Sequence, residues 1–175
     1  QQEGSLRTES LSELDVQFVY LMSFSPEREK SSALNKAIEH IWQLAEDYWT
    51  EKGLRSQAMI ALAAYREKRL GLYTNIRNSI SERSIIEEEK GRFWIMPRGY
   101  HWYQQPIETH SLLMELYADT ESAEKENWVN EMKYWLLSQK RTQHWKTTTA
   151  TANACYALLM TGDDWLESSE WPEIK

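Results

Sequence analysis

Residues 147–161 read TTTATANACYALLMT, a stretch long enough for a helix that contains no charged side chain. The segment before it, residues 121–140, has apolar residues on only one side of a helix. A helix that is apolar around most of its girth must be enclosed by other protein, whereas an amphipathic helix covers a core with one face. We therefore expect inner helices that are sheathed by outer ones, with residues 147–161 enclosed.

The pattern of the inner helix recurs along the chain. Four segments combine a start that bears Ser or Thr, small and aliphatic residues, and an aromatic residue near the end: residues 8–22, 54–68, 107–120 and 147–161. Their starts lie roughly 40 to 50 residues apart, a spacing typical of helical repeats. Three amphipathic segments lie between them, at residues 31–49, 72–89 and 124–140. The alternation predicts an all-α fold built from hairpins of inner and outer helices.

Hairpins of this kind can close into a ring, the α/α toroid, in which inner helices form the wall and outer helices shield it. Seven helices supply only part of a full ring. We therefore expect residues 1–175 to form a single domain with the architecture of a partial α/α toroid. An open solenoid of helical repeats is the alternative.

Residues 91–105 do not follow the helical pattern. Bulky side chains alternate on either side of Pro97-Arg98-Gly99, which predicts a short β-hairpin near residues 92–104. This aromatic hairpin and the start of the next helix are the first candidates for contact with a ligand or a neighbouring domain. The candidate residues are Trp94, Tyr100, His101, Trp102, Tyr103, Glu108 and His110.

The arrangement of titratable residues does not indicate a reaction centre. Glu108 and His110 are two positions apart on the expected helix, so they point to different sides. A carboxylate in a first helical turn is explained by the helix dipole. The threonines at 147–149 and 151 are explained by helix capping and close packing of helices. The His and Cys spacings of zinc sites, Gly-rich phosphate loops and nucleophile elbows are all absent. We therefore predict a non-enzymatic protein with no catalytic residue, no metal ion and no cofactor.

Composition limits the partners of the protein. The formal net charge is −7, with basic residues dispersed among acids, whereas nucleic-acid binding depends on clustered Lys and Arg. No stretch reaches the ~18 apolar residues of a membrane span. We therefore expect neither nucleic acid nor a membrane as a partner. The single cysteine, Cys155, lies in an apolar run and is predicted to be a buried, unreactive thiol.

Three stretches carry a resemblance to a known family: residues 102–113 (WYQQPIETHSLL), residues 132–137 (MKYWLL) and residues 139–152 (QKRTQHWKTTTATA). They resemble the helical domain of bacterial alpha-2-macroglobulin-like proteins, which corresponds to the thioester domain of macroglobulins and complement proteins. The resemblance is strongest over residues 94–165 and weaker before residue 53. It implies that the chain is the C-terminal part of an α/α toroid and a fragment of a much larger multidomain protein.

The resemblance also implies a function. Members of the family are secreted or periplasmic and trap peptidases after a bait region is cleaved. Some carry a Cys-Gly-Glu-Gln or Cys-Leu-Glu-Gln motif that forms a thioester, but here Cys155 is followed by Tyr156, Ala157 and Leu158, so no thioester is expected in this chain. The implied function is that of a non-enzymatic domain of an endopeptidase inhibitor, located in the periplasm, at the cell envelope or outside the cell. Its partners would be neighbouring domains of the same polypeptide and the trapped peptidases.

Two other functions fit the same pattern. A carbohydrate-active or terpenoid-processing toroid enzyme would hold its substrate in an aromatic cavity, with Trp94 and the aromatic residues at 100–103 stacking on it. Glu108 or His110 would then move protons. A helical-repeat scaffold for protein partners would instead present a continuous concave apolar surface.

Overall fold

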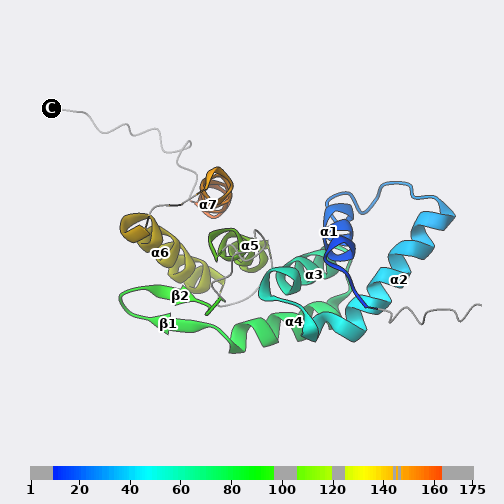
Figure 1. Ribbon diagram of the computed structural model, residues 1–175, viewed down its shortest axis with the longest axis horizontal. Helices are drawn as coiled ribbons and strands as arrows, with labels where there is room; N and C mark the ends of the chain where they lie inside the picture. Colours follow the sequence, from blue (N-terminus) through cyan, green and yellow to red (C-terminus); the bar gives the residue numbers. More distant parts are fainter. Residues whose placement is uncertain (1–9, 97–105, 120–124, 144, 146, 163–175) are drawn as a thin grey trace, which may run out of the picture. The chain divides into compact units, whose positions relative to one another are not determined.

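The computed structural model describes residues 10–96, 106–119, 125–143, 145 and 147–162. In this part of the chain the fold is mostly helical, with seven α-helices, one short 3-10 helix and one two-stranded antiparallel sheet (Figure 1). The predicted helical class is confirmed. The chain divides into two compact units, residues 1–84 with 94–98 and residues 85–93 with 99–175.

The first unit contains four α-helices and the 3-10 helix. These are α1 (Glu13–Met22), α2 (Ser32–Tyr48), η1 (Trp49–Glu51), α3 (Leu54–Arg66) and α4 (Leu70–Glu82). α1 begins with a capping box, in which Ser12 Oγ accepts from the Asp15 amide at 3.1 Å and the Asp15 carboxylate accepts from the Ser12 amide at 2.9 Å. α3 packs on α1 and α4. Every residue from 56 to 64 is buried, so the burial predicted for the uncharged core of residues 54–68 is confirmed.

Gln57 is a buried polar residue within the uncharged part of α3. Its Nε2 donates to the carbonyl oxygens of Trp49 at 3.2 Å and Lys52 at 2.9 Å. Its Oε1 accepts from the guanidinium of Arg83. Because donors and acceptor are all engaged, the amide is tolerated in the core and joins α3 to η1 and to the end of α4.

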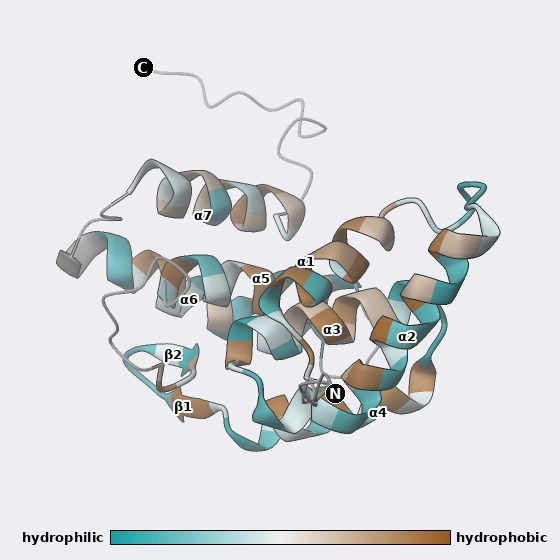
Figure 2. Ribbon diagram, turned by 45° about the vertical axis from the view of Figure 1, so that its right-hand side comes forward, coloured by the Kyte–Doolittle hydropathy of each residue, from teal (hydrophilic) through white to brown (hydrophobic). Residues whose placement is uncertain are grey.

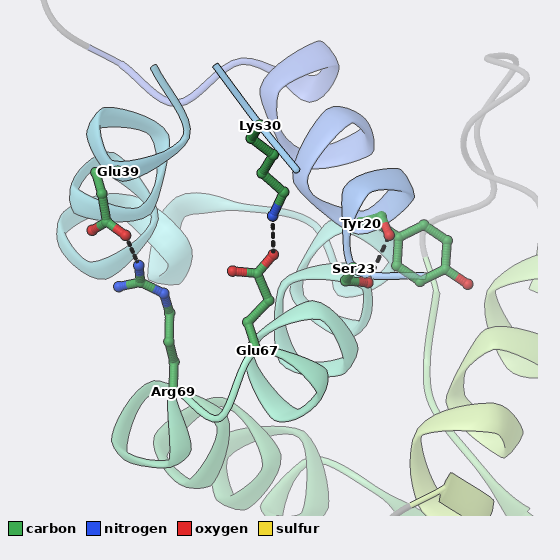
Figure 3. A network of polar contacts seen from close by, with 6 residues as sticks. All are labelled: Tyr20, Ser23, Lys30, Glu39, Glu67 and Arg69. Carbon is green, nitrogen blue, oxygen red and sulfur yellow. Dashed lines mark hydrogen bonds and ion pairs between the residues drawn. The ribbon is translucent and has the colours of Figure 1, made fainter. Parts of the chain in front are cut away.

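Charged residues tie α2 to the turn between α3 and α4. Lys30 Nζ lies 3.7 Å from Glu67 Oε1, and Arg69 pairs with Glu39 of α2 (Figure 3). The guanidinium carbon of Arg69 also lies 4.8 Å from the ring centroid of Trp42. An exposed ion pair alone contributes little, but the stacking on a buried indole adds to the contact between α2 and the turn.

Lys68 occupies that turn with a φ of 61°, in the left-handed region that L side chains rarely adopt. The Arg69 amide donates to the Ala64 carbonyl at 2.7 Å, the closure typical of a Schellman helix end. We expect Lys68→Gly to raise the free energy of unfolding by about 0.5–1 kcal/mol in urea denaturation, because glycine removes the steric cost. Lys36→Gly, at an exposed position within α2, is the control and is expected to lower it by about 1 kcal/mol. A Lys68→Gly protein that is less stable than the wild type would contradict the inference that the backbone of Lys68 is strained.

The second unit contains β1 (Ile85–Glu87), β2 (Gly91–Phe93), α5 (Pro106–Asp119), α6 (Lys125–Gln143) and α7 (Thr148–Met160). In the hairpin Ile85 pairs with Phe93 and Glu87 with Gly91. β2 packs on α6, and α5 packs on both α6 and α7. Every residue from 108 to 117 of α5 is buried, so the burial predicted for this segment is confirmed.

The hairpin lies at a different place from the predicted one. β2 coincides with the start of the first predicted strand, but its partner is β1, across a turn at residues 88–90. The second predicted strand, residues 100–104, lies outside the described residues. The helix predicted over residues 72–89 ends at Glu82, because two β-branched isoleucines favour a strand and the acids at 87–89 would destabilise a helix C-terminus.

Among the described residues of the second unit, α7 packs on α5 with one side (Figure 2). Its buried side consists of Ala150, Ala154 and Ala157, and α5 is its main neighbour within the described residues. On the other side Leu159 is 82% exposed, and Cys155 is exposed as well. The prediction of an enclosed helix over residues 147–161 is therefore wrong, and so is the predicted burial of Cys155. Burial of this uncharged helix would be favourable. Among the described residues, however, no second element packs on the side of α7 that carries Cys155 and Leu159.

Candidate functional site

The residues predicted to form a site fall in three parts of the chain. Trp94 belongs to the first unit, and Glu108 and His110 belong to the second. Tyr100, His101, Trp102 and Tyr103 lie outside the described residues. The surroundings of each described residue show what it can do.

Trp94 is buried within the first unit, with 4% of its surface exposed. Its Nε1 donates to the carbonyl oxygen of Ile80 at 2.8 Å. The same carbonyl accepts from the Arg83 amide at 3.2 Å, so the indole is a second donor to a carbonyl near the end of α4. Trp94 therefore anchors the chain that follows β2 to α4.

His110 is completely buried between α5 and α6. Its Nε2 lies 3.0 Å from the carbonyl oxygen of Met132, and since a carbonyl only accepts, Nε2 carries the proton. The imidazole packs on Trp135, with 4.2 Å between ring centroids. Burial lowers the pKa of His110 to about 4, against the opposing effect of the hydrogen bond to Met132. The ring is therefore neutral near pH 7 and belongs to the interior.

Glu108 is also buried, in the first turn of α5. Its Oε1 accepts from the hydroxyl of Thr147 at 3.4 Å. The same hydroxyl accepts from the amide of Ala150 at 2.9 Å and caps α7, so the capping predicted for the run of threonines is confirmed, at Thr147. The carboxylate thus links the start of α5 to the start of α7, where helix dipoles favour negative charge.

The hairpin is attached to α6 by a contact that the sequence pattern did not indicate. Arg92 Nε lies 2.7 Å from Glu131 Oε2, and its guanidinium carbon lies 3.6 Å from the ring centroid of Trp128. Phe93 stacks on Trp135, with 16° between the ring planes. The spacing of Trp128, Glu131 and Trp135 places them on one side of α6. From the sequence alone, that spacing could have indicated that another element packs on this side of α6.

We expect the Arg92 contact to contribute measurably to stability. Arg92→Met should lower the free energy of unfolding by about 1–2 kcal/mol, because both a partly buried ion pair and a cation–π contact are lost. Lys90→Met on the same hairpin is the matched control and should change it by less than about 0.5 kcal/mol, since the Lys90–Glu87 pair is exposed. Urea denaturation measures both values. Equal effects of the two substitutions would contradict the proposed role of Arg92.

An open depression of about 490 Å³ lies in the first unit, along α2. It is lined by Asn35, Lys36, Glu39, His40, Gln43, Glu46 and Arg69. Its charges are mixed, and Trp94 does not line it. Among the described residues no three His, Cys, Asp or Glu side chains are placed to hold a metal ion. None of the described helices is both long and apolar enough to cross a membrane.

The described site residues are therefore engaged in packing. Trp94, Glu108 and His110 each form a hydrogen bond inside their own unit. Comparison of the chain with protein-family models, curated proteins and solved structures finds no match.

Proposed function

We propose that the chain is a non-enzymatic domain of a bacterial alpha-2-macroglobulin-like endopeptidase inhibitor. In this proposal its hairpins form part of an α/α toroid that packs against neighbouring domains of the same polypeptide. The observation that carries the proposal is the burial of α3 over residues 56–64 and of α5 over residues 108–117. Each of them packs on an outer helix with more exposed residues, α4 and α6. This is the organisation that the resemblance of residues 94–165 implies.

The polar residues of α5 support a role in packing. Glu108 binds Thr147, and His110 binds the backbone of α6. In an enzyme that moved protons with Glu108 or His110, the residue that did so would have to reach a substrate. The alternative of a carbohydrate- or terpenoid-processing toroid enzyme therefore has less support.

The proposed trapping uses no thioester within this chain. A thioester needs a cysteine and a glutamine in a short motif, and Cys155 is followed by Tyr156 within α7. The proposed location is the periplasm, the cell envelope or the exterior of the cell, as the resemblance implies. A peptidase would then be held by rearrangement of the domains around it.

The proposal is tested with the natural polypeptide that contains this chain and a panel of endopeptidases. Trapping should decrease cleavage of a large substrate such as casein at least several-fold, while cleavage of a small chromogenic peptide is retained, because the enclosed active site stays accessible to small molecules. A polypeptide already cleaved by one peptidase is the control and should not trap a second. Undiminished casein cleavage by every peptidase would refute the proposal.

A further inference from the structure

The β1–β2 hairpin belongs to a different unit from the chain on either side of it. Residues up to 84 and from 94 to 98 belong to the first unit, whereas residues 85–93 belong to the second. The two ends of this stretch are joined inside the first unit, because Trp94 Nε1 donates to the carbonyl oxygen of Ile80 at 2.8 Å. This closure of residues 81–93 into a loop therefore does not depend on α6.

The hairpin is held on α6 by side chains of β2. Arg92 pairs with Glu131 and lies over the ring of Trp128. Phe93 stacks on Trp135. Within the described residues β1 contacts mainly β2, and each strand has only three residues. Because a pair of strands this short is not stable without support, loss of the contact with α6 also ends the pairing of β1 with β2.

α6 has contacts with α5 that do not involve the hairpin. His110 Nε2 donates to the carbonyl oxygen of Met132 at 3.0 Å, and its ring packs on Trp135. Tyr117 stacks on Trp128, with 4.7 Å between the ring centroids and 18° between the ring planes. Both tryptophans thus contact buried residues of α5 as well as the hairpin. These contacts keep α6 on α5 when the hairpin is absent.

We infer that the β1–β2 hairpin is a latch, which undocks from α6 while α4, α5 and α6 stay folded. Undocking breaks the contacts of Arg92 and Phe93 and uncovers Trp128 and Trp135 on one side of α6. A segment with few buried contacts opens at a lower free energy than the fold as a whole. The latch follows from these contacts independently of the proposed inhibitor function, and it gives the second unit an aromatic surface that is covered only in the docked state.

Hydrogen exchange of the full chain, followed for each amide by NMR at neutral pH, tests the inference. The amides that pair β1 with β2 should exchange at least about tenfold faster than the amides in the middle of α4 and α6. Urea at about 1 M should change exchange in the hairpin by less than about twofold, because undocking exposes little surface. The same urea should accelerate exchange in the middle of α6 at least about fivefold, because those amides exchange only when the unit unfolds.

A variant with a weakened latch gives the second readout. Arg92→Met should accelerate exchange in the hairpin about tenfold and leave α4 unchanged, because the ion pair with Glu131 and the cation–π contact with Trp128 are both lost. Lys90→Met is the matched control within the same hairpin. It should change exchange there by less than about twofold, since the pair of Lys90 with Glu87 is exposed.

Three results would overturn the inference. The first is equal exchange rates with equal urea dependence in the hairpin and in α6, because the hairpin would then open only when the whole unit unfolds. The second is an Arg92→Met protein whose hairpin exchanges like that of the wild type. The third is a loss of helical circular dichroism in Arg92→Met, because the helices would then depend on the docked hairpin.

Discussion

Gly91→Ala is expected to lower the free energy of unfolding by at least about 3 kcal/mol, because the added methyl group would overlap the backbone of α6. A Cβ at this position would lie 2.2 Å from the carbonyl oxygen of Glu131 and 3.2 Å from the amide nitrogen of Trp135. Both are backbone atoms of α6, so no side-chain rotation relieves the clash. The φ of +76° adds strain for any L residue. Urea denaturation measures the loss.

Hydrogen exchange locates the effect of Gly91→Ala. Protection should decrease in β1, β2 and α6, because the hairpin can no longer approach the helix. Gly71→Ala is the control: nothing lies within 4 Å of its added Cβ, and a helical alanine should stabilise the protein by about 0.5–1 kcal/mol. A Gly91→Ala protein as stable as the wild type would show that the hairpin does not dock closely on α6.

Acidification from neutral pH to about 4 is expected to destabilise the second unit by about 3 kcal/mol through His110 alone. Burial lowers the pKa of His110 from 6.5 to about 4 in the folded protein. At pH values between about 4 and 6.5, His110 binds a proton in the unfolded chain but not in the folded chain. The stability is therefore fully present above about pH 6.5 and is lost as the pH falls through the folded pKa of about 4. Each pKa unit corresponds to about 1.4 kcal/mol.

The contribution of His110 is isolated by comparing variants, since carboxylates also titrate in acid. In His110→Gln the free energy of unfolding should fall less steeply with pH between about 6.5 and 4 than in the wild type, whatever its absolute stability. His40→Gln, at an exposed position on α2, should retain the slope of the wild type. Identical slopes in His110→Gln and the wild type would contradict the burial of a neutral imidazole.

The candidate site was predictable only in part. The N-cap at Thr147 follows from local chemistry, because its hydroxyl satisfies an amide three residues away. The contact of Arg92 with Trp128 and Glu131 joins residues that are far apart in the sequence. Such a contact depends on the docking of β2 on α6, and no local pattern contains that information.

The amino-acid sequence by itself determined which segments form helices and which of their sides are apolar. Residues 54–68 and 107–120 were predicted as inner helices, and α3 is buried over residues 56–64 and α5 over residues 108–117. Periodicity is a local property, set by 3.6 residues per turn, so it is read from one segment at a time.

Only the tertiary structure decided whether an apolar side is covered. α5 and α7 have similar sequence patterns, yet α5 packs on two helices and α7 mainly on one within the described residues, so Leu159 and Cys155 are exposed. It also decided the partner of β2 and the neutral state of His110. Apolar character gives a free-energy gain only when another surface excludes water, and whether that surface is present depends on residues distant in the sequence.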